Sequence, residues 1–274
     1  MRATRATRAT RATRATQTTR TKLLRPAAAL GAAAVLAATL TACGGSSQAA
    51  TRTESRDQRH EKNTQRDNGK NHAKNHDKNY AEDTTTLRQL MKLDETPAKL
   101  SDATLVLVDY QNVYTDGTME LTGWRDAVKN TKTLLERARK AHTPVIHIVE
   151  KGYDLKSEAG QIIPALKPVR GETVVEKAVP NGFHDTDLAA ELKKTGRKNV
   201  ILSGFMTHMC TLFTAEGAVY NGYNPTVVGD ASATRPLPVK GNPRGIPARQ
   251  VHESALATIQ DRFGVVVPKQ RDLK

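Results

Sequence analysis

The sequence predicts an α/β fold, a three-layer Rossmann-like structure in which a parallel sheet of about six strands is covered by helices on both faces. From about residue 100 onward, short continuous apolar runs alternate with segments whose apolar residues recur at helical spacing. The apolar runs show little alternation of apolar and polar residues, which is typical of parallel strands buried on both faces. We place this single domain at residues 87–274.

Six apolar runs are the expected strands, in chain order 104–108, 144–149, 173–175, 199–202, 225–228 and 265–267. Helices are expected between and after them. Their apolar stripes are Trp124, Val128, Thr131, Leu135 and Ala138; Leu188 and Leu192; Leu212, Ala215 and Val219; and Val251, Ala255, Ile259 and Phe263. The loops 152–168 and 236–247 are expected to shape a pocket.

Three chemically capable side chains follow three of these strands. Asp109 comes directly after its strand, Lys177 follows the third apolar run, and Cys210 follows the fourth run and a turn that begins at Gly204. Because sites in such sheets form at the carboxyl ends of the strands, we expect the three to meet at one edge. Each has a structural alternative when taken alone, Asp109 as a cap or turn residue and Lys177 as a solvated surface charge.

Cys210 is the candidate nucleophile, because it lies where an apolar strand ends and a helix begins. A thiol at a helix N-terminus gains from the positive end of the helix dipole, which favours the thiolate. The alternative is a buried cysteine that acts as a small hydrophobic residue. The one other cysteine, Cys43, lies in a segment with the pattern of a processing signal, so no intramolecular disulfide is expected.

The N-terminal segment predicts export. Residues 1–25 carry eight Lys or Arg and no acid, and residues 26–42 form an uncharged run rich in Ala and Leu. The run is shorter than the ~20 residues of a membrane-spanning helix. Together with Leu40-Thr41-Ala42-Cys43 it resembles a bacterial lipoprotein signal, with residues 1–42 as the signal peptide and Cys43 as the lipidated first residue. The domain would then be anchored to the outer face of the cytoplasmic membrane. An ordinary secretory signal, which would give a secreted protein, is the alternative.

Residues 43–86 are expected to be a disordered polar tether, since they contain almost no large apolar residues. His72 and His76 lie four residues apart, as in a metal-binding tail, but neighbouring lysines repel cations and a solvated spacer is the default. Of the net charge of +14, +8 lies in residues 1–42, and aromatic residues make up 4% of the chain. No nucleic-acid partner is therefore expected.

Several strings resemble the isochorismatase-like cysteine hydrolases. They are Leu107-Val108-Asp109-Tyr110-Gln111, the Glu176-Lys177 pair ahead of Phe183, and Gly204-Phe205-Met206-Thr207-His208-Met209-Cys210. Gly222-Tyr223 and the run from Gly229 to Arg235 match the region of the family's fifth strand. The resemblance covers roughly residues 102–268. The form of the cysteine string is similar to the branch that includes streptothricin hydrolase, which opens a cyclic amide.

The resemblance implies a catalytic triad of Asp109, Lys177 and Cys210. Asp109 would take the thiol proton and return it to the leaving nitrogen, while Lys177 holds the carboxylate and thiolate charges in place. The resemblance also implies a cis peptide between Phe205 and Met206, with the N–H groups of Met206 and Cys210 as an oxyanion hole.

The expected reaction is attack of the Cys210 thiolate on the carbonyl of a C–N bond in a small molecule, loss of the amine, and hydrolysis of the thioester. One alternative is an isochorismatase-type ether hydrolase, although members of that type typically lack the nucleophilic cysteine. A second is a non-catalytic surface lipoprotein that uses the fold for binding. The family usually forms dimers or larger assemblies, so a homo-oligomer is expected.

Candidate pocket residues are Tyr110, Gln111, Tyr114, Phe183 and His208. His208 has an equally good alternative as a capping or surface residue of the helix that carries the cysteine. Asp230 ends a predicted strand and is expected to be structural.

No cofactor and no metal ion are expected. Nicotinamidases, which are relatives within the superfamily, hold a divalent ion with an Asp-x-His motif and further histidines after the second strand. Residues 148–183 of this chain contain no His, and Glu150, Asp154 and Glu158 lack the imidazole partners of such a site. His147 lies within a predicted strand and is expected to be packed or hydrogen-bonded. Negligible nicotinamidase activity is therefore expected.

Overall fold

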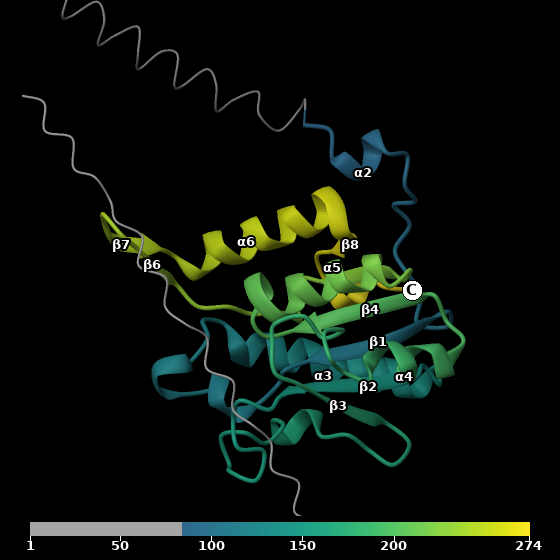
Figure 1. Ribbon diagram of the computed structural model, residues 1–274, viewed down its shortest axis with the longest axis horizontal. Helices are drawn as coiled ribbons and strands as arrows, with labels where there is room; N and C mark the ends of the chain where they lie inside the picture. Colours follow the sequence, from purple (N-terminus) through teal and green to yellow (C-terminus); the bar gives the residue numbers. More distant parts are fainter. Residues whose placement is uncertain (1–83) are drawn as a thin grey trace, which may run out of the picture. The chain divides into compact units, whose positions relative to one another are not determined.

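The computed structural model describes residues 84–274 of the chain (Figure 1). The predicted signal peptide, the lipidation at Cys43 and nearly all of the predicted tether lie outside the described residues. The predicted domain boundary at residue 87 coincides with the start of a short helix, α2 (Leu87–Leu90), which Thr86 caps through its side chain. Among residues 84–274, no helix has the length and hydropathy that crossing a membrane requires.

The main sheet has six strands, and all of its neighbouring pairs are parallel, as predicted. The strands are β1 (Ala103–Val108), β2 (Val145–Glu150), β3 (Thr173–Lys177), β4 (Asn199–Gly204), β5 (Asn224–Val228) and β8 (Val265–Val267). Their order is β3-β2-β1-β4-β5-β8, so the direction of winding reverses between β1 and β4. In open parallel sheets this reversal leaves a crevice at the carboxyl ends of the two central strands.

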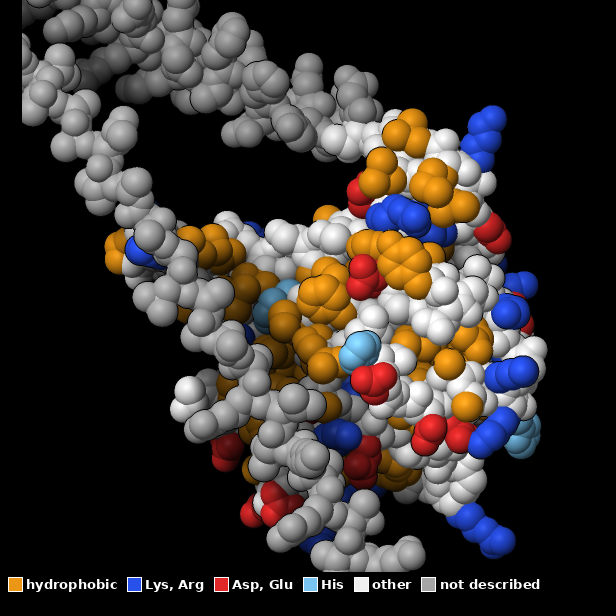
Figure 2. All heavy atoms as spheres, in the orientation of Figure 1, with side chains coloured by type: hydrophobic (Ala, Val, Ile, Leu, Met, Phe, Trp, Pro, Cys, Tyr) orange, Lys and Arg blue, Asp and Glu red, His pale blue; other side chains and the backbone are white. Residues whose placement is uncertain are grey.

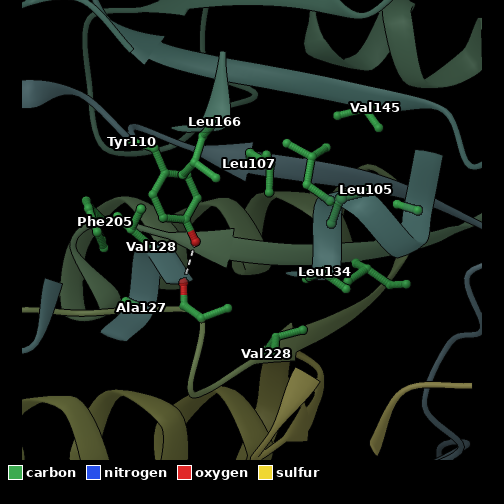
Figure 3. Packing of buried hydrophobic residues seen from close by; sticks show 14 of the residues in the cluster. Leu105, Leu107, Tyr110, Ala127, Val128, Leu134, Val145, Leu166, Phe205 and Val228 are labelled. Carbon is green, nitrogen blue, oxygen red and sulfur yellow. Dashed lines mark hydrogen bonds between the residues drawn. The ribbon is translucent and has the colours of Figure 1, made fainter. Parts of the chain in front are cut away.

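Helices cover both faces of the sheet (Figure 1). They are α3 (Trp124–Lys140), α4 (Leu188–Thr195), α5 (Leu212–Tyr220) and α6 (Ala248–Thr258). Alternate residues of β1 enter two different cores, because successive strand side chains point to opposite faces. Leu105 and Leu107 pack with the buried face of α3 (Figure 3), whereas Val106 and Val108 pack with α4 and α5. The three-layer prediction is thus confirmed.

The helical stripes were predicted with mixed success. Thr131, Leu135 and Ala138 of α3 and both predicted leucines of α4 are buried. The predicted face of α5 is wrong at Val219, which is only partly buried, since the helix buries Thr214, Ala215, Gly217 and Ala218. A π-helical turn over Thr207–Thr211 precedes α5, and a second one over Ile259–Phe263 follows α6.

The segment 236–247, expected to be a loop, contains an antiparallel hairpin instead. Its strands are β6 (Leu237–Val239) and β7 (Asn242–Ile246), and they extend away from the main sheet ahead of α6 (Figure 1). Gly245 has φ +61°, and a Cβ there would lie 2.5 Å from the Leu237 carbonyl oxygen, so the close pairing of the two strands requires glycine.

The surface carries interspersed basic and acidic side chains, with apolar groups gathered around α2 (Figure 2). Leu87, Leu90, Met91 and Leu93 are the exposed large apolar residues of that segment.

Candidate active site

Four reactive or ionisable side chains meet at the carboxyl edge of the sheet. Asp109 follows β1, Glu150 ends β2, Lys177 ends β3, and Cys210 lies in the π-helical turn between β4 and α5. The structure therefore brings together the three residues that the sequence placed at this edge, and adds Glu150 to them.

The turn that carries Cys210 depends on a close approach of β4 to β1. A Cβ on Gly204 would lie 2.3 Å from the Val108 carbonyl oxygen, so a larger residue would push the two strands apart. The Phe205–Met206 peptide bond that follows is cis, as the family resemblance implies. Met206 then begins the turn, and Cys210 lies within it, 6% exposed.

The Lys177 ammonium lies at the centre of the cluster. Its Nζ is 2.7 Å from Asp109 Oδ2, 3.0 Å from Glu150 Oε2 and 3.3 Å from Cys210 Sγ. The Lys177 side chain is completely buried. Burial favours the neutral amine, but the negative charge of Asp109 and the hydrogen bonds to Asp109 and Glu150 outweigh it and raise the pKa of Lys177. The group is therefore a fixed positive charge beside the thiol.

Asp109 is equally buried and suits the role of proton acceptor. Its backbone has φ +52°, an uncommon conformation for a residue other than glycine. Apart from the Lys177 ammonium and the Cys210 thiol, its carboxylate oxygens have no hydrogen-bond donor among residues 84–274. Burial raises the pKa of Asp109 to about 6, against the lowering effect of Lys177.

Cys210 differs from the expectation of a thiolate favoured by the helix dipole. Burial, together with the negative charge of Asp109, raises the pKa of the Cys210 thiol to about 12, although Lys177 opposes this. The resting cysteine is thus a neutral thiol, because desolvation and Asp109 outweigh the positive charge of Lys177. Transfer of its proton to a neighbouring base is then required before it can attack.

Glu150 is the site residue that sequence reasoning missed. Its sequence pattern indicates only a metal ligand without imidazole partners, although it directly follows an apolar run just as Asp109 does. Its side chain is 18% exposed, whereas those of Asp109 and Lys177 are fully buried. Glu150 is therefore the charged member of the cluster that solvent reaches.

Two of the expected pocket residues, Tyr110 and Gln111, use their polar groups in hydrogen bonds within the fold. Tyr110 points into the core on the α3 side (Figure 3), where its hydroxyl donates to the Ala231 carbonyl, accepts from Thr131 Oγ1 (2.7 Å) and lies 3.0 Å from Ser203 Oγ. The Gln111 amide is used by the main chain, since it donates to the Gly160 carbonyl (2.8 Å) and the Glu150 carbonyl (3.2 Å) and accepts from the Glu150 N–H (2.8 Å). The expected substrate contact of these two side chains is therefore corrected.

The other three pocket candidates, Tyr114, Phe183 and His208, differ in their surroundings. Tyr114 is buried, its ring packs edge-on against that of Phe205, and burial and the negative charge of Asp109 raise its pKa. Phe183 is half-buried, with its ring centroid 6.0 Å from that of Tyr223. His208 Nδ1 lies 2.5 Å from Thr234 Oγ1, and burial lowers the pKa of its imidazole. For these residues substrate contact stays a prediction.

Two further residues have clear structural environments. Asp230 accepts a hydrogen bond from the Gln270 N–H (2.8 Å), as expected of a structural residue. His147 is buried, as expected, with Nε2 3.0 Å from Glu172 Oε2, and Arg139 donates to the same carboxylate. In the described part of the chain, no group of three or more His, Cys, Asp or Glu side chains converges as a metal site would.

Comparison with known proteins gives consistent matches. Residues 103–271 match the family model of the isochorismatase domain. The chain is 31% identical over 189 residues to the secreted isochorismatase effector Isc1 of Verticillium dahliae, covering 67% of this chain and 96% of that protein. It is 28% identical over 168 residues to streptothricin hydrolase of Streptomyces noursei, covering 59% of this chain and 67% of that protein. The crystal structure of an isochorismatase from Pseudomonas putida is similar with a TM-score of 0.67 at 40% identity, covering 70% of this chain and all of that one.

Proposed function

This chain belongs to the isochorismatase family, and on that premise we propose that it is a cysteine hydrolase that cleaves a C–N bond in a small amide or cyclic amide. The observation that carries the proposal is the contact of one buried ammonium, that of Lys177, with both the Asp109 carboxylate and the Cys210 thiol. A thiol, a base and a fixed cation in contact are the groups that nucleophilic catalysis needs. The relationship to streptothricin hydrolase supports a C–N substrate.

In the proposed mechanism, Cys210 transfers its proton to Asp109 as Sγ attacks the carbonyl carbon. Lys177 stabilises the developing negative charge on sulfur. The C–N bond then breaks, and the nitrogen leaves with the proton that Asp109 returns to it. Water, giving a proton to Asp109, hydrolyses the thioester and releases the carboxylic acid and the Cys210 thiol.

The proposed oxyanion hole consists of the N–H groups of Met206 and Cys210. In support, the Met206 N–H has no acceptor among residues 84–274. A backbone donor without a partner at the start of the nucleophile turn is free to bind the oxygen of a tetrahedral intermediate.

Hydrolysis of an enol ether is the second candidate. The similarity to two proteins named isochorismatase, from Verticillium dahliae and Pseudomonas putida, favours it. The thiol favours C–N hydrolysis, because cleavage of an ether needs no acyl-enzyme.

The deciding experiment is a substrate panel for the full chain. Primary, cyclic and N-carbamoyl amides would be assayed for released amine, and isochorismate for its loss, with Cys210→Ala as the control. We expect amine release from one class of amide and a mass increase at Cys210 during turnover. Turnover of isochorismate that persists in Cys210→Ala would replace the amidase proposal by the ether reaction. Inactivity on every compound, together with a Cys210 that iodoacetamide does not alkylate, would favour a binding role.

Export and metal independence are part of the same proposal. A relative that is itself named as secreted supports export, and we propose a lipid anchor at Cys43. Dialysis against EDTA is expected to leave activity unchanged. Activity that disappears with the chelator and returns with zinc or iron would contradict a metal-free site. A homo-oligomer remains our expectation, to be checked by light scattering.

A further inference from the structure

Sheet register places Glu150 beside Lys177. The two residues are partners across β2 and β3, at the carboxyl ends of both strands. Partners at the same height in neighbouring parallel strands extend their side chains on the same face of the sheet. Glu150 Oε2 accordingly reaches Lys177 Nζ at 3.0 Å.

Hydrogen bonds hold Glu150 in this position. Gln111 contacts both the N–H and the carbonyl of Glu150 through its side-chain amide. The second carboxylate oxygen, Oε1, accepts from the Gly152 N–H at 2.9 Å, and a Cβ at residue 152 would lie 3.1 Å from that oxygen. The backbone and the carboxylate of Glu150 are thus both fixed around the Lys177 ammonium.

Glu150 completes the surroundings of that ammonium. An ammonium has three hydrogens, and Lys177 Nζ has three acceptors within reach, on Asp109, Cys210 and Glu150. Without Glu150, one hydrogen of a buried cation would lack a partner and the ammonium would be free to turn.

Glu150 also adds a second negative charge to the cluster. A second carboxylate beside the same cation makes it harder for Asp109 to ionise. Burial is the main cause of the raised pKa of Asp109, and the charge of Glu150 adds to it.

We propose that Glu150 is a positioning residue: its carboxylate orients the Lys177 ammonium between Asp109 and Cys210, and its negative charge keeps Asp109 able to accept the thiol proton. The proposal rests on the proposed function, because that function makes Asp109 the base. Tyr114 is a further titratable group beside the cluster. Burial and the negative charge of Asp109 raise its pKa, so it keeps its proton at acid pH and does not account for a titration there.

The test is alkylation of Cys210 by iodoacetamide in the full chain, followed at that residue by peptide mass spectrometry from about pH 4 to about pH 9. This readout needs no substrate. In the wild type we expect the rate to rise with a midpoint near the pKa of Asp109, about 6. Below it the pair holds both protons, and no thiolate forms.

Glu150→Gln keeps an oxygen for the Lys177 ammonium but removes the charge. Loss of a neighbouring negative charge favours ionisation of the Asp109–Cys210 pair, so the midpoint should move to lower pH by on the order of one unit. The matched control is Glu176→Gln, the same substitution one residue before Lys177 at an exposed position of β3. It is expected to leave the midpoint at the wild-type value.

A wild-type midpoint in Glu150→Gln, or an equal shift in Glu176→Gln, would overturn the proposal. Should Glu150→Gln fail to fold, Glu150→Asp decides, because it keeps the charge but draws it back from Lys177 Nζ. For Glu150→Asp we then expect the alkylation rate to rise at the wild-type midpoint pH but to level off at a several-fold lower value. A wild-type rate at high pH would contradict the positioning role. If the alkylation midpoint shifts in Glu150→Gln but the wild-type protein hydrolyses no amide, the proposed function is rejected, whereas the influence of Glu150 on the Asp109–Cys210 pair is upheld.

Discussion

Asp109 and Lys177 form an ion pair in which both side chains are completely buried, with Oδ2 2.7 Å from Nζ. Removing two charges from water costs several kcal/mol per ion, so such a pair is a poor way to stabilise a fold. Lys177 Nζ also lies 3.3 Å from Cys210 Sγ, which indicates that the two charges act on the cysteine thiol.

Loss of any member of the Asp109–Lys177–Cys210 cluster should abolish turnover. Cys210→Ala removes the nucleophile and Asp109→Asn removes the proton acceptor, so each should lose roughly a thousandfold or more in kcat. Lys177→Ala should lose comparably, and a double variant no more than a single one, because the three groups act as a unit. Circular dichroism would check that the first two variants keep the fold. More than a few percent of activity in Cys210→Ala would refute the covalent mechanism.

Activity should fall in acid with a midpoint near pH 6. The pKa of Asp109 is raised to about 6 by burial, so below that pH the carboxyl group is protonated and cannot accept the thiol proton. Above it the base is ionised, and kcat/KM should level off. The measurement is kcat/KM against pH on the amide identified in the panel. His208→Gln is the control for a titrating imidazole and should keep the same midpoint, whatever its effect on rate. A midpoint that disappears in His208→Gln would assign the titration to that residue.

Cys43→Ser should release the protein from membranes or block its processing. Cys43 lies outside the described residues, and this prediction rests on the basic N-terminal segment and on Leu40-Thr41-Ala42-Cys43. The wild-type chain should fractionate with membranes and begin at a lipidated Cys43 by mass spectrometry, and Ser46→Ala should behave like the wild type. A full-length chain that is soluble in the cytosol and begins at Met1 or Arg2 would contradict the prediction.

The catalytic edge of the sheet could be predicted because it depends on strand order alone. Each continuous apolar run predicted a strand, and the residue types that followed three of the runs, Asp109, Lys177 and Cys210, are suited to nucleophilic catalysis. Glu150 follows the second run, 144–149, but was not predicted as a site residue, because its partner Lys177 is distant in sequence and their contact depends on the register of β2 and β3.

The pocket residues were harder to predict because strand alternation ends where the loops begin. The positive φ of Asp109 turns the chain, so the alternation of β1 no longer says which way Tyr110 and Gln111 point. The β6–β7 hairpin was missed for a different reason. Pro238 and Pro243 argue against strands, but both strands of an isolated hairpin are edges, where proline is tolerated.

Tyr110→Phe should lower stability and leave catalysis intact, because the Tyr110 hydroxyl is used in the core. The substitution removes the hydroxyl that contacts the Ala231 carbonyl, Ser203 Oγ and Thr131 Oγ1, at a cost of about 1–3 kcal/mol. In a domain of this size that corresponds to a fall in Tm of several °C. Thermal unfolding and steady-state kinetics would measure both effects.

Thr131→Val is the matched variant, since Thr131 Oγ1 donates to the same hydroxyl at 2.7 Å. Because the two residues share one network, the loss in the double variant should be smaller than the sum of the single losses. Full additivity would show that the hydroxyls act independently. If Tyr110→Phe instead raised KM with no change in Tm, Tyr110 would be a substrate contact, and its place in the core would not describe the working enzyme.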